Sequence, residues 1–109
     1  MKLDLKALIE KLLQINTKTL ILDKTATGTY PVSDISQFRY LLFVGGNSDF
    51  STILVTSYVP FDEFSQVRMT WTVNGSTATL DTVIDKMSNT SIKISSITSS
   101  RRIKIYGIK

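Results

Sequence analysis

The chain has 109 residues, of which 42% are hydrophobic and 20% are charged, and its formal net charge is +4. These values are typical of one folded domain with a single core, and they argue against disorder. The sequence contains neither cysteine nor histidine, which excludes disulfides, thiolate chemistry and the commonest general base and transition-metal ligand. The thirteen basic residues are spread along the chain, so we expect a mildly basic surface and no nucleic-acid partner.

The N-terminal segment, residues 1–17, is the only part of the chain with helical periodicity. At about 100° per residue, its aliphatic side chains fall on one arc of a helix, and its charged side chains lie off that arc. Asp4 stands at the start, where a carboxylate favours the positive end of the helix dipole. A helix this short is marginal in water, so we expect its apolar face to be covered.

The apolar face of this helix can be covered in two ways, by other chains or by the β-sheet of its own chain. Met1 and the leucine and isoleucine side chains that follow it at 4-3-4-3 spacing form a coiled-coil seam of two heptads. Two further residues, Ile9 and Leu13, widen the seam, as in a helix that lies on its own sheet. We favour a hub between chains, in a homo-oligomer that is expected to be a trimer. The expected interface residues are Leu5, Leu8, Ile9, Leu12 and Ile15.

Residues 18–109 are expected to form a second unit made of β-strands. The chain holds thirteen serines and fourteen threonines, an enrichment common on exposed faces of β structure. We expect eight strands, at residues 19–23, 25–32, 38–44, 51–59, 67–73, 77–84, 91–97 and 102–108. Short strands separated by regular turn signals predict a mainly β fold, an antiparallel β-sandwich that is jelly-roll-like.

Several strands carry a more specific signal. Residues 38–44 are apolar on both alternating faces, which predicts a central strand covered on both sides and ended by Gly45-Gly46. Pro31 restricts the second strand to an edge of a sheet. Asn74-Gly75 predicts a hairpin between its neighbouring strands. The change of phase at Ile97 predicts a bend or bulge.

Three tyrosines are candidates for ligand contact, namely Tyr30, Tyr58 and Tyr106. Each can place its ring at the rim of a sheet with its hydroxyl in water, an arrangement typical of glycan contacts and of subunit interfaces. Trp71 alternates with the apolar residues of its strand, so we expect it in the core rather than in a sugar site.

We expect no catalytic residues, no cofactor and no metal, and therefore no enzyme. Gly45-Gly46 lies between two strands, whereas a phosphate-binding loop leads into a helix. Asp62 and Glu63 lack the alternating spacing of a calcium loop, and they are expected to be solvated. Asp81 and Asp85 share one face of a strand, but nothing marks them as an acid–base pair.

No segment approaches the roughly 20 apolar residues that a membrane-spanning helix needs, so we expect no membrane insertion. Charged residues interrupt the apolar positions at the N-terminus, unlike the unbroken apolar run of a signal peptide. We therefore expect synthesis in the cytoplasm without export by the usual route.

Three stretches resemble small tail proteins of prophages in gut bacteria. Residues 34–44 resemble a turn and strand common in these proteins, and residues 103–109, Ile-Lys-Ile-Tyr-Gly-Ile-Lys, are similar to their ending. Residues 1–9 are similar to the start of baseplate-associated proteins from the same elements. The resemblance covers about a third of the chain and carries no catalytic motif. The long fibrous shaft of a tail fibre is absent from the sequence.

The resemblance implies a β-sandwich or jelly-roll appendage of a phage tail, commonly trimeric, located in the virion and used in assembly or in contact with the host surface. Other tail proteins and host glycans are the partners it implies. The alternative is a small, lectin-like carbohydrate-binding module without a phage role, whose helix packs on its own sheet.

Overall fold

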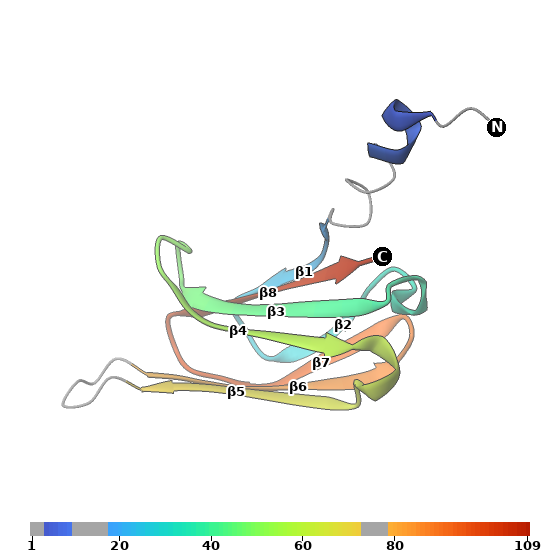
Figure 1. The fold of residues 1–109 in the computed structure, drawn as a ribbon. Coiled ribbons are helices and arrows are strands. Elements are labelled where there is room, and N and C mark those ends of the chain that lie inside the picture. The colour runs from blue at the N-terminus through green and yellow to red at the C-terminus, as the bar shows by residue number, and fades with distance from the viewer. Residues whose placement is uncertain (1–3, 10–17, 73–78) are drawn as a thin grey trace.

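The computed structural model describes residues 4–9, 18–72 and 79–109, and it shows two antiparallel four-stranded sheets packed face to face (Figure 1). Sheet A has the strand order β1-β8-β3-β4, and sheet B has the order β2-β7-β6-β5. The strands are β1 (Lys18–Lys24), β2 (Gly28–Pro31), β3 (Tyr40–Asn47), β4 (Ile53–Pro60), β5 (Gln66–Thr72), β6 (Thr79–Ser88), β7 (Ser91–Ile97) and β8 (Arg101–Ile108). The predicted β-sandwich is confirmed.

In both sheets, a strand from the start of the chain pairs with one from its end. The first strand pairs with the last in sheet A, and β2 pairs with β7 in sheet B. The other two strands of each sheet form a hairpin of neighbours in sequence, β3–β4 in sheet A and β5–β6 in sheet B. The β-sandwich is thus observed, whereas the finer jelly-roll topology stays a prediction.

All eight predicted strands are present, with shifted ends. β2 is an edge strand that ends at Pro31, and β5 and β6 form the predicted hairpin, although Asn74-Gly75 lies outside the described residues. The predicted bulge is present in β7. The consecutive β6 residues Val83 and Ile84 pair with Ser96 and Ile94, so Ser95 is the extra, unpaired residue of β7.

The prediction that Gly45-Gly46 ends the third strand is wrong, because β3 continues to Asn47. The glycines allow close packing within the strand. A Cβ at Gly45 would lie 2.9 Å from the side chain of Leu80, and one at Gly46 would lie 2.5 Å from the carbonyl oxygen of Thr52. A shift of the β3–β4 register between the two glycines accommodates this close approach.

One hydrophobic core fills the space between the sheets. Trp71 packs against it, as predicted, and Phe43 and Phe64 meet edge to face with ring centroids 5.2 Å apart at one end. The buried hydroxyl of Thr82 donates a hydrogen bond of 2.7 Å to the carbonyl oxygen of Ser96. The core residues are Leu22, Ile35, Phe38, Leu41, Phe43, Phe64, Val67, Met69, Leu80, Ile84, Ile92, Ile94, Ile103 and Ile105.

Residues 5–9 are helical, and in Figure 1 this N-terminal helix stands away from the sandwich. Asp4 caps it: its carboxylate accepts a hydrogen bond of 3.2 Å from the backbone N–H of Ala7. Leu5, Leu8 and Ile9 are 60%, 41% and 54% exposed. The other expected interface residues, Leu12 and Ile15, lie outside the described residues. Within the described ranges, no helix has the length and hydropathy needed to span a bilayer.

Candidate binding surface

The outer face of sheet A is apolar at its centre. On β3, Leu41 and Phe43 point into the core, so Leu42 and Val44 point outward. These two outward side chains are nevertheless only 7% and 5% exposed. The prediction that this strand is central and buried on both faces is confirmed.

The strand register aligns the outward side chains in rows across sheet A. One row joins Leu20, Tyr106, Leu42 and Tyr58, and the next joins Lys18, Ile108, Tyr40 and Pro60. We call six of these residues the aromatic face: Leu20, Tyr40, Leu42, Tyr58, Tyr106 and Ile108. Tyr58 is 65% exposed, Leu20 is 52% exposed and Tyr40 is 43% exposed. The Nζ atom of Lys18 lies 4.7 Å from the ring centroid of Tyr106.

Three tyrosines surround Leu42 on this face. Tyr58 and Tyr106 lie two strands apart, which places their backbones about 10 Å from each other. Tyr40 lies between them, one row further along β3. The sequence did not single out Tyr40, because it belongs to an apolar run. Its alternation with the inward residue Leu41 is the signal that places it outside.

The structure separates Tyr30 from the other two predicted tyrosines. Tyr30 lies on β2 of sheet B, and its ring packs against the core. Its hydroxyl donates a hydrogen bond of 2.6 Å to the carbonyl oxygen of Ala26. The Nζ atom of Lys24 lies 4.9 Å from its ring centroid. Local contacts therefore hold this side chain, whereas Tyr58 and Tyr106 share the aromatic face.

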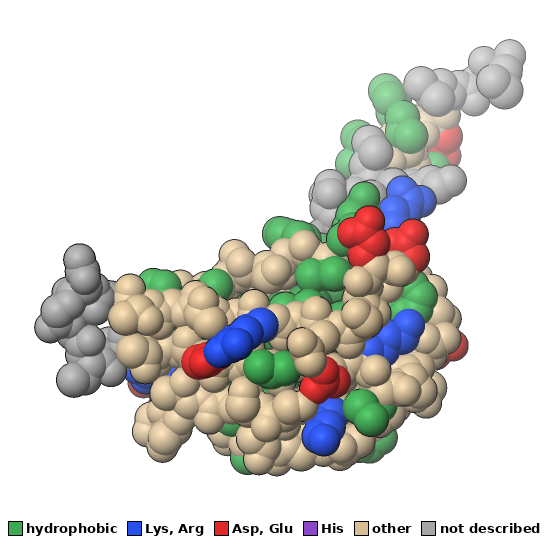
Figure 2. All heavy atoms as spheres, turned by 90° about the horizontal axis from the view of Figure 1, so that it is seen from below, with side chains coloured by type: hydrophobic (Ala, Val, Ile, Leu, Met, Phe, Trp, Pro, Cys, Tyr) green, Lys and Arg blue, Asp and Glu red, His purple; other side chains and the backbone are tan. Residues whose placement is uncertain are grey.

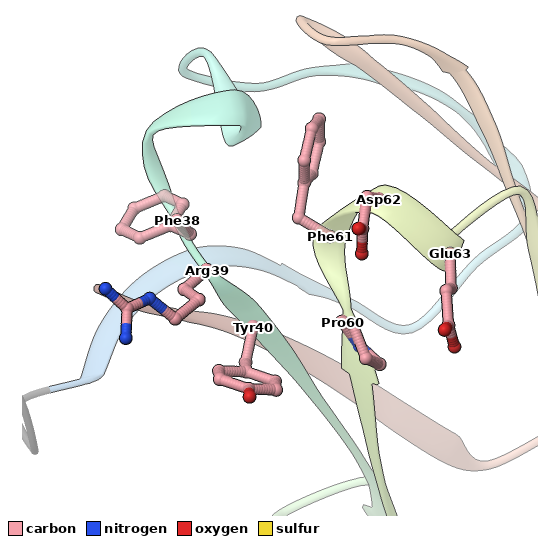
Figure 3. Close-up of a pocket in the computed structure, with 7 residues that line it drawn as sticks. All are labelled: Phe38, Arg39, Tyr40, Pro60, Phe61, Asp62 and Glu63. Atoms are coloured by element: carbon pink, nitrogen blue, oxygen red, sulfur yellow. The ribbon is translucent and has the colours of Figure 1, made fainter.

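A hollow of about 470 Å³ opens beside the aromatic face, at the end of sheet A where β3 begins and β4 ends. Figure 3 shows Arg39 on the β3 side and the carboxylates of Asp62 and Glu63 on the side of the 3-10 turn η2 (Phe61–Glu63). Tyr40 belongs both to the hollow and to the aromatic face. The lining residues are Phe38, Arg39, Tyr40, Pro60, Phe61, Asp62 and Glu63.

Backbone hydrogen bonds fix the walls of the hollow. The N–H of Phe61 donates to the carbonyl oxygen of Arg39 at 3.0 Å, and the N–H of Arg39 donates to the carbonyl oxygen of Ile108 at 2.8 Å. η2 closes with a hydrogen bond of 3.1 Å from Phe64 N–H to the Phe61 carbonyl. Asp62 and Glu63 are exposed, as the sequence predicted. The hollow therefore has a fixed backbone and polar side chains at its rim.

The other half of the outer face of sheet A is occupied by contacts within the chain. Arg102 Nε donates a hydrogen bond of 2.6 Å to Asp23, and a second guanidinium nitrogen reaches the other carboxylate oxygen. This hydrogen bonding, with the positive charge of Arg102, holds the pKa of Asp23 below its usual value. The ring of Phe50 lies under Lys104, whose Nζ atom is 4.4 Å from its centroid. These contacts leave the aromatic face as the open half.

The outer face of sheet B carries polar groups that bind one another (Figure 2). Arg68 donates two hydrogen bonds, of 3.2 and 3.0 Å, to the carboxylate of Asp81. Asp85 accepts hydrogen bonds from Ser95 and, at 2.6 Å, from Gln66, and these bonds lower its pKa. Asp81 and Asp85 share this face, as the sequence predicted, and each has its own partners. In the described part of the chain, no group of three or more carboxylate, histidine or cysteine side chains could hold a metal ion.

Comparison with known proteins returned no matching family model, no matching curated protein and no matching solved structure. The surfaces of the chain are therefore the guide to its function. The two surfaces that bear on it are the N-terminal helix and the aromatic face with its adjoining hollow.

Proposed function

We propose that the chain is a non-enzymatic structural protein of a phage or prophage tail or baseplate, which acts as a homo-oligomer in virion assembly or host-surface contact. The observation that carries this proposal is the presence of two uncovered apolar surfaces on a single chain. One is formed by Leu5, Leu8 and Ile9 of the helix, and the other is the aromatic face. Contiguous apolar surface of this kind is typical of association sites.

Association would stabilise both surfaces. Full burial of one leucine or isoleucine side chain contributes about 1.5–3 kcal/mol, so the three exposed helix residues are a substantial driving force. A short helix gains most of its stability from packing rather than from its intrinsic propensity. Helix formation and assembly are therefore coupled in this proposal. A trimer is favoured, because the apolar arc is wider than the seam of a two-stranded coiled coil.

The assignment to a tail rests on the resemblance of residues 1–9, 34–44 and 103–109. The second and third stretches include most of β3 and β8, which are antiparallel neighbours at the centre of sheet A. Within the pair, Tyr40 lies opposite Ile108 and Leu42 lies opposite Tyr106. Two stretches far apart in sequence thus form one continuous region, which includes most of the aromatic face. This supports a shared role for the two stretches.

The proposal is tested on particles from the bacterium that carries the gene. After prophage induction, tail particles are purified by sedimentation and their peptides are measured by mass spectrometry, with and without deletion of the gene. We expect the chain at a fixed ratio to other tail proteins, and defective assembly or adsorption after deletion. Absence of the chain from the particles, together with normal particles from the deletion strain, contradicts the proposal.

A second candidate function, a carbohydrate-binding module, is favoured by the hollow. The Tyr40 ring can stack on the C–H face of a sugar, while Asp62 and Glu63 can accept hydrogen bonds from hydroxyl groups. Arg39 on the opposite side adds a donor, and this mixture of charges favours a neutral glycan. An array of neutral glycans tests it. We expect binding by the wild type, loss of binding in Tyr40→Ala and retention in Thr70→Ala on sheet B. Glycan binding that is retained in Tyr40→Ala would rule out the hollow as the binding site.

A further inference from the structure

Two apolar surfaces of this chain remain uncovered within the same copy. Leu5, Leu8 and Ile9 of the N-terminal helix are between 41% and 60% exposed, and Tyr58 and Leu20 of the aromatic face are 65% and 52% exposed. If the helix covered the sheet of its own chain, both sets would be shielded. We infer that the aromatic face of sheet A is covered by the N-terminal helix of a second copy of this chain. This contact presupposes the homo-oligomer proposed above, and it replaces a helix–helix hub by a helix–sheet contact.

The position of the helix in the chain allows it to contact the aromatic face of a second copy. The helix precedes β1, one of the two edge strands of sheet A, and Lys18 at the start of β1 lies in the same row as Ile108 and Tyr40. Eight residues separate Ile9 from Lys18, a length that can span at most about 30 Å. The helix is therefore tethered close to an aromatic face, and it can reach that of an adjacent copy. A head-to-tail contact of this type closes into a ring when the copies are related by rotation.

The chemistry of the two surfaces matches. Leu42 is almost buried, and it is ringed by the more exposed Tyr40, Tyr58 and Tyr106, so the centre of the face suits a branched aliphatic side chain from the helix. Leu20 and Ile108 extend the face with aliphatic surface, which favours an apolar protein segment over a polyhydroxyl ligand.

Charges at the rim are also complementary. Asp62 and Glu63 lie beside Tyr40 in the hollow, and the ion pairs among the described residues are Arg68–Asp81 and Arg102–Asp23. The two carboxylates are thus available to a cation from outside. The helix presents Lys6 next to Leu5. A helix that lies across the aromatic face can bring this ammonium group to the carboxylates of its neighbour.

The sequence contains no cysteine, so single cysteines can be introduced without background reactions. Leu8→Cys is made in one preparation and Tyr58→Cys in a second, tagged preparation; both positions are exposed, so the substitutions leave the core intact. The two are mixed in denaturant, refolded together and oxidised. We expect a disulfide between the two preparations at least tenfold more abundant than in a control mixture of Leu8→Cys with Thr70→Cys on sheet B. Leu20→Cys, on the other side of Leu42, provides a second acceptor position.

Three other results would overturn the helix–sheet contact, and each of them indicates a different arrangement. A predominant disulfide between two Leu8→Cys chains indicates a helix–helix hub, which leaves the proposed oligomer intact. A disulfide within one chain of the double variant Leu8→Cys/Tyr58→Cys, independent of dilution, indicates a lid on its own sheet. A single-chain mass for the wild type without any of these disulfides contradicts both the contact and the oligomer. Retained folding of each variant is checked by circular dichroism.

Discussion

The two sheets enclose the same core but present opposite chemistry on their outer faces. On sheet B, Arg68 binds Asp81, and Gln66 and Ser95 bind Asp85, so the polar groups of this face satisfy one another and contact water (Figure 2). On sheet A, tyrosine and aliphatic side chains surround a leucine that is almost buried. The comparison indicates that the outer face of sheet B is suited to water, whereas half of the outer face of sheet A is suited to contact with another apolar surface.

The first prediction compares two valines that point outward from central strands of opposite sheets. Val44 on β3 is 5% exposed, whereas Val83 on β6 is only partly buried. We expect Val44→Ala to lower the free energy of unfolding by about 2 kcal/mol and Val83→Ala by less than about 1 kcal/mol, because only the first change opens a cavity. Urea unfolding at one protein concentration measures both. Equal losses would mean that the two outer faces are packed alike.

The second prediction compares two tyrosine hydroxyls. The hydroxyl of Tyr30 donates to the carbonyl oxygen of Ala26, whereas Tyr58 is exposed on the aromatic face. Tyr30→Phe is expected to lower the free energy of unfolding by about 1 kcal/mol, the net value of one hydrogen bond. Tyr58→Phe is expected to change it by less than about 0.5 kcal/mol. Thermal unfolding distinguishes them, and a larger effect at Tyr58 would contradict the assignment of Tyr30 as the locally bonded residue.

The third prediction concerns pH. Hydrogen bonding to Arg102 lowers the pKa of Asp23 below its ordinary value of 3.8. The stabilisation is therefore fully present above pH 3.8, and it is lost as the pH falls through the lowered folded-state pKa. Asp23→Asn should destabilise the protein slightly at neutral pH and reduce the loss of stability as the pH falls below 3.8. Unfolding curves across this range measure the effect, and Asp81→Asn on sheet B is the matched control. An unchanged acid slope in Asp23→Asn would show that this pair contributes nothing.

The sequence was sufficient to predict the strands, since alternation, turn residues and bulge signals are local properties. It also placed Trp71 in the core and marked residues 38–44 as a central strand. It failed at Gly45-Gly46, where the need for glycine arises from the close approach of Leu80 and Thr52, which only the folded chain brings there. The grouping of Tyr40, Tyr58 and Tyr106 depends on which strands become neighbours. That order is nonlocal, and alternation alone does not determine it.

The central claim is that the aromatic face of sheet A is an interface between copies, and light scattering tests it most directly. The wild type should have the mass of three chains of 12.2 kDa each. Tyr58→Glu introduces a charge beside Leu42, within the proposed contact, and it should reduce the mass to that of one chain. Thr70→Glu, the matched control on sheet B, should leave the mass unchanged. A wild-type mass of one chain, or an unchanged mass for Tyr58→Glu, would contradict the claim.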